Sequence, residues 1–298
     1  MKVAITGGAG FIGSHIADRF KEDGFKVRII DDFSTGKMEN CRKHEIVKCS
    51  ITDLKKLKKS FAGCDFAIHN AAKIYVPESM EKPDVYNYVN VTGTLNVLLA
   101  AKASKIKKVV FASSAAVYGN TKPPLREESR LSPLSVYAAS KIMGEEYCRL
   151  FNGYFNLDAV SLRYFNAFGP RQNIKSAYAA VVPIFISNFA RKKPAVIFGD
   201  GKQTRDFIYV KNIAEANLKA IKSRKANGMV FNIASGKPIS ILDLAQKISP
   251  KLKIVHKPSR KGDIRHSLAD VSISRKILGN YSRFSFEEGL KETAKFCF

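Results

Sequence analysis

The sequence predicts an α/β protein with a doubly wound parallel sheet and a smaller C-terminal α/β lobe. Three observations lead to this prediction. Short apolar runs alternate with amphipathic segments through the first half of the 298-residue chain, a glycine-rich loop follows the first run, and the alternation loses its regularity after about Asn166. Strand and helix patterns that alternate in this way are typical of a parallel sheet with helices on both faces.

The periodicity of apolar residues places the individual elements. Strands are predicted at Lys2–Thr6, Lys26–Asp31, Glu45–Lys48, Phe66–His69, Lys108–Ser113 and Asp158–Arg163. Helices are predicted at Phe11–Asp23, Asp53–Phe61, Val85–Ser104, Val136–Phe151, Val210–Lys222, Ile241–Ile248 and Phe286–Phe296. We expect a first domain over residues 1–166, a return segment near residues 206–235 that rejoins it, and a lobe over residues 167–298.

The composition is that of a globular protein without a membrane span. Hydrophobic residues make up 45% of the chain, enough to bury a core, and no apolar run approaches the roughly 18 residues that a span needs. The start of the chain carries no leader pattern, so we expect a cytoplasmic protein. The five cysteines are scattered and odd in number, which favours free thiols and gives no support to a metal site.

The formal net charge of +24 raises the question of a nucleic-acid partner. The lysines are spread over helices and loops, as at residues 55–59 and 105–108, and no nucleic-acid motif accompanies them. We interpret each run as a solvated face, and we expect no nucleic-acid partner.

A strand, a glycine-rich turn and a helix start follow one another at the beginning of the chain. Gly7 permits a sharp turn, Gly10 lets the backbone approach a pyrophosphate, and Gly13 lets the helix pack close to the strand. The helix N-terminus offers free N–H groups and its positive dipole end to the phosphates. The sequence therefore predicts a Rossmann-type domain that binds a dinucleotide.

A carboxylate about twenty residues past the glycine loop selects between the two nicotinamide dinucleotides. The second predicted strand ends at Asp31, which fits a ribose hydroxyl and would repel a 2′-phosphate. This favours NAD over NADP. The alternative interpretation is that Asp31 or Asp32 only caps a turn.

A tyrosine and a lysine provide a candidate acid/base pair. Tyr137 and Lys141 are four residues apart on a predicted helix and therefore share one face. A lysine ammonium favours the phenolate and lowers the pKa of the phenol, which suits proton transfer near neutral pH. Upstream, Ser113 and Ser114 end a predicted strand, where ligands of parallel sheets bind. They could help to move a proton or only cap a turn.

In these elements the chain resembles the extended short-chain dehydrogenase/reductase family and, within it, the UDP-glucose 4-epimerases. The resemblance covers essentially the whole chain. It is carried by the motifs Thr6–Gly13, Asp31–Gly36, His69–Ala72, Asn90–Thr94, Ser113–Gly119, Tyr137–Lys141, Arg163–Asn166, Gly169–Gln172 and Gly199–Phe207. It implies an NAD-dependent isomerase that interconverts UDP-glucose and UDP-galactose by transient oxidation at carbon 4.

The resemblance also implies roles for individual residues. Tyr137 would take the proton from the sugar's 4-hydroxyl, Lys141 would lower its pKa and hold the nicotinamide ribose, and Ser114 would bridge Tyr137 and the sugar. The implied cofactor contacts are Gly7, Gly10, Phe11, Ile12 and Gly13 at the pyrophosphate, Asp31 at the adenine ribose, Ala71, Ala72, Lys73, Asn90, Ser113 and Tyr164 toward the nicotinamide, and also Asp32, Ser34, Thr35, Gly36, Ser50 and Ile51. The implied substrate contacts are Asn166, Val182, Phe198, the phosphate-binding Arg205 and Arg260, Asp263 at the uridine ribose, and Ser267.

Three positions bear on specificity within the family. Cys49-Ser50-Ile51 stands where the family usually has Gly-Asp-Ile, which removes a carboxylate expected near the adenine amine. Ala115-Ala116 follows the serine pair, where a 4,6-dehydratase needs an acid pair, and alanines cannot transfer protons. Ser267 falls at the family's gate beside the sugar, where a small residue admits an N-acetyl group; a slip of one residue would put His266 or Leu268 there.

Several alternatives remain open at this point. The chain could act on N-acetyl sugars or glucuronate, as another nucleotide-sugar epimerase or dehydratase of the same family. A non-catalytic NAD-sensing or RNA-binding protein on the same fold is a further alternative. We also expect a homodimer, because the helices at 85–104 and 136–151 carry apolar residues on more than one face. These residues are Val91, Leu95, Val97, Leu98, Ile142 and Met143. The resemblance implies that the two helices form an intersubunit four-helix bundle.

Overall fold

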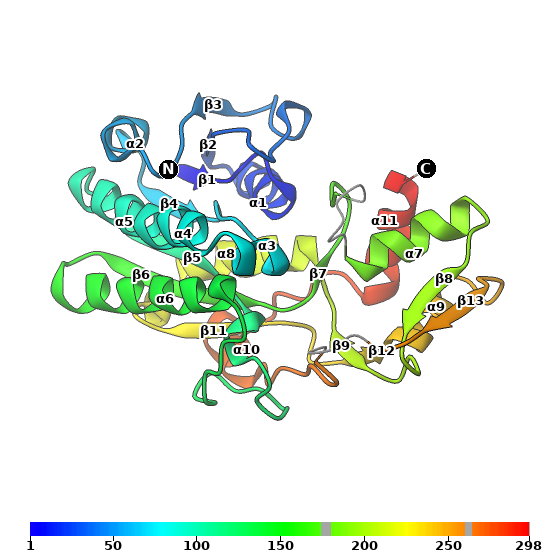
Figure 1. The fold of residues 1–298 in the computed structure, drawn as a ribbon. Coiled ribbons are helices and arrows are strands. Elements are labelled where there is room, and N and C mark those ends of the chain that lie inside the picture. The colour runs from blue at the N-terminus through cyan, green and yellow to red at the C-terminus, as the bar shows by residue number, and fades with distance from the viewer. Residues whose placement is uncertain (174–179, 260–263, 298) are drawn as a thin grey trace.

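Seven strands form the central sheet of the protein, in a computed structural model that describes residues 1–173, 180–259 and 264–297 (Figure 1). They are β1 (Lys2–Thr6), β2 (Lys26–Asp31), β3 (Glu45–Lys48), β4 (Phe66–His69), β5 (Lys108–Ser114), β6 (Asp158–Tyr164) and β11 (Val230–Ile233). Their order is β11-β6-β5-β4-β1-β2-β3, and every neighbouring pair is parallel. The predicted doubly wound parallel sheet is confirmed.

The apolar alternation along each strand divides its side chains between two cores. On β1, Val3 and Ile5 join one core, whereas Ala4 joins the other. On β5, Val110 belongs to the first core and Phe111 to the second. The sheet therefore needs helices on both faces, which is why its strands are apolar almost throughout.

Helices cover both faces of this sheet (Figure 1). The first core contains buried residues of α1 (Phe11–Glu22) and α8 (Val210–Lys222). The second contains buried residues of α2 (Leu54–Phe61), α5 (Gly93–Ala103) and α6 (Val136–Tyr154). Shorter helices are α3 (Val76–Glu81), α4 (Pro83–Tyr86) and α10 (Ser272–Leu278).

The helix predicted over Val85–Ser104 is not a single regular α-helix. The segment is made of α4, a π-helical stretch at Asn87–Thr92, and α5. A π-helical turn holds an additional residue, so it shifts the side chains that follow around the helix axis. Here the turn carries Asn90, which is buried and hydrogen-bonded to the loop after β4 through Lys73.

The remaining elements form a smaller lobe (Figure 1). Two-stranded pairs join β8 (Ala195–Phe198) to β13 (Ile254–Lys257) and β9 (Thr204–Asp206) to β12 (Pro238–Ser240). Phenylalanine and aliphatic side chains of α7 (Val181–Ala190), α9 (Ile241–Ile248) and α11 (Phe286–Cys297) form the lobe's own core with these strands. The short pair of β7 (Ala167–Phe168) and β10 (Ile208–Tyr209) connects the lobe's core with the first core of the sheet, since its residues contribute to both.

The chain passes back into the large sheet after its first excursion into the lobe. Helix α8 packs in the core that contains α1, and β11 pairs with β6 at the sheet edge. Both elements lie within the segment near residues 206–235. We therefore propose to assign that segment to the first domain, with the boundary near residue 166.

Three observations on the described residues concern membrane and metal chemistry. Among them, no helix combines the length and the apolar character needed to cross a membrane. Within the same ranges, His, Cys, Asp and Glu residues do not gather in groups of three that could hold a metal ion. The five cysteines all lie in the described ranges and are free thiols.

The strand order fixes where a ligand can bind. From β1 the chain moves outward to β2 and β3, and then crosses back to β4 on the opposite side of β1. At such a switch point the loops after the two central strands diverge and leave a crevice at the carboxyl edge of the sheet. Gly7 follows β1 and Asn70 follows β4, so these two loops form the walls of that crevice.

Candidate active site

The glycine loop between β1 and α1 leaves no space for side chains. Gly7 has a φ of +66°, and a Cβ there would come within 2.7 Å of the Ala71 backbone. A Cβ on Gly13 would overlap the carbonyl oxygen of Gly7. The loop is closed by the Gly10 amide, which donates to the Gly7 carbonyl at 3.2 Å, and α1 begins at Phe11. This backbone therefore forms a cradle at a helix N-terminus, which is the environment that a pyrophosphate requires.

A cavity of about 290 Å³, the cofactor cavity, lies over this loop and the carboxyl ends of the central strands. It is lined by most of the predicted cofactor contacts: Gly7, Gly10, Phe11, Ile12, Asp31, Asp32, Ser34, Thr35, Ile51, Ala71, Ala72, Lys73, Ser113, Tyr137, Lys141 and Tyr164. Six further residues line the cavity that were not predicted as cofactor contacts: Ile30, Cys49, Asn70, Ile74, Val89 and Ala112. All of these lie in or next to the motifs, but nothing in their residue types marks them as ligand contacts.

Four predicted cofactor residues are not among those that line the cavity. Gly13 and Gly36 pack behind the glycine loop, against Gly7 and Asp31. The Ser50 hydroxyl is hydrogen-bonded to that of Thr52 at 2.9 Å, and Cys49 and Ile51 contribute the wall instead. Asn90 forms hydrogen bonds with the backbone of Lys73, so it holds a lining residue in place.

Asp31 caps a turn, as the alternative interpretation allowed, and it also holds the glycine loop. One carboxylate oxygen accepts the Ala9 amide of the glycine loop at 2.9 Å, and the other caps a turn by accepting the Phe33 amide at 2.8 Å. Asp32 caps a turn as well, through the Ser34 amide. Burial raises the pKa of Asp31, and these two amide hydrogen bonds oppose the rise. The carboxylate still lines the cavity and keeps acceptor capacity for a ribose hydroxyl.

Tyr137 and Lys141 both lie in the first turns of α6, which begins at Val136. Ser135 caps this helix, and its side chain accepts the Ala138 amide. The Lys141 ammonium lies 5.9 Å from the centre of the Tyr137 ring and donates to the Ala112 carbonyl at 2.7 Å. Burial lowers the pKa of Lys141 to about 8. Burial raises the pKa of Tyr137, and the contact with the Ser114 side chain opposes that rise.

The net shift of the Tyr137 pKa is therefore upward, and the lowering expected from a charged Lys141 stays a prediction. Helical spacing places the two residues on one face, but it does not reveal how far each is withdrawn from water. Desolvation of the phenol is the largest cause of the upward shift, and it outweighs the opposing contact with Ser114. The effect of burial on a titratable group depends on everything packed around it.

The two serines at the end of β5 have different surroundings. Ser113 is buried, and its hydroxyl donates to the Glu145 carboxylate. The Ser114 hydroxyl accepts the Ala116 amide at 3.1 Å and so caps the short helical turn Ala115–Tyr118, as the alternative interpretation allowed. The Ser114 side chain also lies in contact with that of Tyr137.

A second cavity of about 1060 Å³, the substrate cavity, adjoins the first, since Gly10, Phe11, Thr35 and Ile74 line both. The predicted substrate contacts Asn166, Val182, Phe198 and Arg205 line it. Ser267 is buried, its amide donates to the Thr204 carbonyl, and it is not among the residues that line either cavity. Arg260 and Asp263 lie outside the described residues.

The substrate cavity contains cations that the sequence analysis did not assign to the site. Lys37, Arg171 and Lys257 line it together with Arg205. Arg171 donates to Asp18 at 2.7 Å through one terminal nitrogen, and its other terminal nitrogen is buried without a hydrogen-bond partner among the described residues. The motif Gly169–Gln172 was the available signal for Arg171, whereas the two lysines are indistinguishable in sequence from the many surface lysines.

Comparisons with known proteins agree with this geometry. The family model described as the NAD dependent epimerase/dehydratase family matches residues 3–234. A putative UDP-glucose 4-epimerase of Methanocaldococcus jannaschii is 37% identical, over 97% of this chain and 96% of that protein. Among solved structures, a UDP-N-acetylglucosamine 4-epimerase from Methanobrevibacter ruminantium, in complex with UDP-N-acetylmuramic acid, is 44% identical with a TM-score of 0.92, covering 99% of this chain and 97% of that one. A UDP-glucose 4-epimerase of Thermus thermophilus in complex with NAD is 31% identical with a TM-score of 0.90, covering 100% and 99%.

Proposed function

The chain belongs to the NAD-dependent epimerase/dehydratase family, and on this basis we propose that it interconverts UDP-glucose and UDP-galactose as a nucleotide-sugar 4-epimerase. It is an isomerase, and its cofactor is NAD. One observation carries the proposal: Tyr137 and Lys141 line the same cavity as the glycine loop, and this cavity adjoins a larger one lined by cations. A dinucleotide in the cofactor cavity would therefore lie next to a charged substrate in the substrate cavity.

The residues present fit NAD. The glycine cradle has no room for side chains on Gly7 or Gly13, and α1 begins directly behind it. Asp31 and Asp32 both line the cavity, and their charges would repel a 2′-phosphate. At the other end, Lys141, Ser113 and Tyr164 would border the nicotinamide.

The chain's own side chains would move the proton of the reaction. NAD, when bound beside these residues, would supply the reversible hydride chemistry at carbon 4 of the sugar. Tyr137 would accept the proton of the 4-hydroxyl and later give it back, with Ser114 bridging the phenol and the sugar. A charged Lys141 would favour the phenolate that must be present before this transfer. Because hydride and proton both return, no net oxidant is consumed.

The substrate cavity supports a nucleoside diphosphate sugar. Arg171 and Arg205 offer guanidinium groups, which suit a diphosphate because they are permanently charged and can bind two oxygens at once. Phe198, Phe185 and Phe207 add apolar surface in the same cavity. We propose that the diphosphate lies beside these arginines, with Arg260 and Asp263 contributing from the segment between the described ranges.

The residues beside Ser114 favour epimerisation over dehydration. Elimination of water needs a group that removes a second proton and a group that protonates the leaving hydroxyl. Ala115 and Ala116 follow Ser114 in the turn that ends β5, and neither can do so. This supports an epimerase over a 4,6-dehydratase.

An N-acetyl sugar is the second candidate substrate. The structure with the highest identity among those compared above carries the name of a UDP-N-acetylglucosamine 4-epimerase. Ser267, the residue that the resemblance places at the gate, is much smaller than tyrosine and would leave room for an acetamido group. We therefore propose that the enzyme also interconverts UDP-N-acetylglucosamine and UDP-N-acetylgalactosamine.

A turnover assay tests both substrates. We expect the purified protein to convert UDP-galactose to UDP-glucose, and to epimerise the N-acetyl pair, without accumulating NADH. In Ser267→Tyr, a gate at this position would lower turnover of the N-acetyl pair relative to that of the glucose pair, although Ser267 itself lines neither cavity. Parallel assays with UDP-glucuronate identify the remaining alternative. Stoichiometric NADH release would contradict epimerisation, and an unchanged substrate ratio in Ser267→Tyr would contradict the gate.

We also propose that the protein is a homodimer paired through α6 and the helical segment that ends in α5. Part of the expected apolar surface packs inward, since Val97 and Leu98 are buried in the sheet core. Met143 on α6 and Tyr88 in the π-helical stretch are exposed, by 44% and 56%. These two side chains supply apolar surface for a partner helix.

Light scattering tests the dimer. We expect a dimer mass at micromolar concentration for the wild type and a smaller mass for Met143→Lys, because a charge buried between the helices costs free energy. Val255→Lys on β13 is the matched control, since Val255 is also 44% exposed and lies in the lobe. A monomeric wild type, or equal effects of the two substitutions, would contradict the proposed interface.

A further inference from the structure

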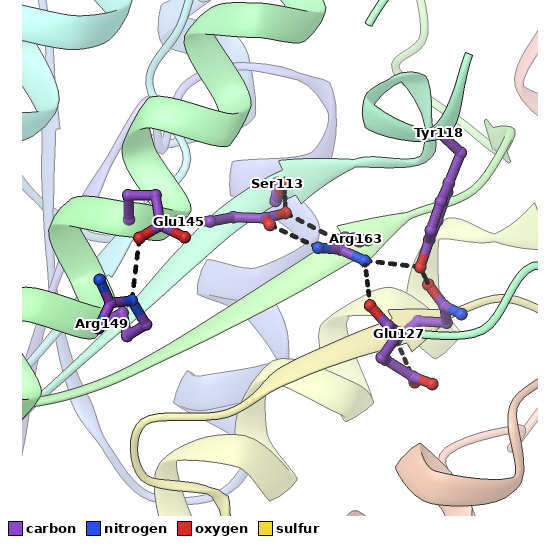
Figure 2. A network of polar contacts seen from close by, with 8 residues as sticks. Ser113, Tyr118, Glu127, Glu145, Arg149 and Arg163 are labelled. Atoms are coloured by element: carbon purple, nitrogen blue, oxygen red, sulfur yellow. Dashed lines mark hydrogen bonds and ion pairs between the residues drawn. The ribbon is translucent and has the colours of Figure 1, made fainter. Parts of the chain in front are cut away.

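A charged pair is buried directly behind the cofactor cavity. Glu145 on α6 and Arg163 on β6 are 5% and 3% exposed. Their contact is bidentate: Glu145 Oε1 accepts Arg163 Nε at 2.9 Å, and Oε2 accepts Nη2 at 2.7 Å. Glu145 Oε1 also accepts the hydroxyl of Ser113, a residue that lines the cavity (Figure 2). The carboxylate thus connects the cavity wall with the interior of the sheet.

Arg163, the second member of the pair, forms further hydrogen bonds on the side away from the cavity. Arg163 Nη1 donates to the Tyr118 hydroxyl at 2.7 Å and to the Glu127 carbonyl at 3.0 Å (Figure 2). The Tyr118 hydroxyl in turn donates to Asn232 on β11 at 2.7 Å. A guanidinium with this many fixed acceptors has one orientation, and it fixes the Glu145 carboxylate in one orientation too.

Glu145 is also one helical turn from Lys141, so the two share a face of α6. Lys141 donates to the carbonyl of Ala112, and the next residue on β5 is Ser113, which donates to Glu145. The carboxylate therefore acts on both polar groups at this end of the cavity, by a direct hydrogen bond to one and by its charge on the other.

We propose that Glu145 is a positioning residue of the active site, which orients the Ser113 hydroxyl and supplies the negative charge that keeps Lys141 protonated. The expected effect on turnover rests on the proposed function, whereas the expected effect on the pKa of Lys141 does not. Arg163 limits how strongly the Glu145 charge acts on Lys141, because its positive charge offsets part of the carboxylate's field.

The groups that face Lys141 support this role. Burial lowers the pKa of Lys141, and the charge of Glu145 on α6 opposes the decrease. The Cys148 thiol on the same helix is neutral there, because burial raises its pKa to about 12. From β4, His69 faces the ammonium as a neutral ring, since burial lowers its pKa to about 3. From β5 and α6 come the rings of Phe111 and Tyr137, at 5.0 Å and 5.9 Å from the ammonium. Without the carboxylate, the pKa of Lys141 would fall below about 8, and the lysine would lose its proton at a lower pH.

A direct titration of Lys141 tests the proposal. The probe is lysine labelled with ¹³C at Cε, observed by NMR in the full-length protein with and without NAD and assigned with Lys141→Met. In Glu145→Gln, an oxygen remains for Ser113 but the charge is lost, and the Lys141 midpoint should fall by roughly one pH unit. The alkaline limb of kcat/KM should move down with it. In Glu145→Gln/Arg163→Met both charges are gone, and the midpoint should return toward the wild-type value.

Glu146→Gln is the matched control, because Glu146 is the next residue, exposed and paired with Arg149 at 2.9 Å; it should leave the Lys141 midpoint unchanged. If Glu145→Gln does not fold, the double variant, which buries no unpaired charge, is compared with Arg163→Met. A Lys141 midpoint that is the same in every folded variant would overturn the proposal. Shifted midpoints in a protein that turns over no UDP sugar would instead overturn the proposed function and leave this inference intact.

Discussion

Tyr137→Phe is expected to reduce epimerase turnover by roughly 10²–10⁴-fold, the usual contribution of a general acid–base group. The substitution removes the phenol oxygen and keeps the ring that lines the cofactor cavity near Lys141. The proton of the sugar hydroxyl then has no acceptor within the site, whereas the cofactor surface is preserved. NAD affinity, measured by calorimetry, should be nearly unchanged, so that the loss appears in kcat.

The control for this experiment lies on the same helix. Tyr154 ends α6 and is 76% exposed, so Tyr154→Phe makes the same chemical change away from the cavity and should retain wild-type turnover. Turnover near the wild-type level in Tyr137→Phe would show that another group moves the proton. A parallel loss of NAD affinity would show that the phenol mainly binds the cofactor.

Gly13→Ala is expected to lower NAD affinity by at least about tenfold, which corresponds to about 1.4 kcal/mol. The added Cβ would overlap the Gly7 carbonyl oxygen, so either α1 or the glycine loop must move away from its position. Overpacking of this kind also destabilises folded proteins, by about 1–3 kcal/mol. Calorimetric titration with NAD and thermal unfolding of the unliganded protein measure the two effects separately.

Gly153→Ala provides the comparison for Gly13→Ala. Gly153 lies near the end of α6, and a Cβ there would meet nothing within 4 Å. Alanine is the better helix former by about 1 kcal/mol, so this variant should be as stable as the wild type or slightly more stable, with unchanged NAD affinity. If Gly13→Ala binds NAD as the wild type does, the glycine loop is not the pyrophosphate cradle.

The large sheet was predictable because its signals are local. The strands at 2–6, 26–31, 45–48 and 66–69 have the predicted bounds, as do the helices at 210–222 and 241–248. In each of these elements the apolar residues recur with a regular period and the ends are clearly marked, and these two signals are enough to place an element that packs in the core. The strand β11 and the lobe pairs β8–β13 and β9–β12 were not predicted. They are as short as β3 and β4, but they lie past Asn166, where the strand–helix alternation that identified those two strands loses its regularity.

The sequence by itself determined the fold class, the glycine cradle and the pairing of Tyr137 with Lys141, because each depends on residue type and on spacing within one or two elements. The tertiary structure alone decided that both groups are buried, so that desolvation is the largest cause of their pKa shifts. It also decided that Glu145 lies against Arg163 and Ser113, which come from three different elements. Desolvation and the field of a buried charge depend on everything packed within several ångströms, and the packing of distant segments cannot be seen in a linear pattern.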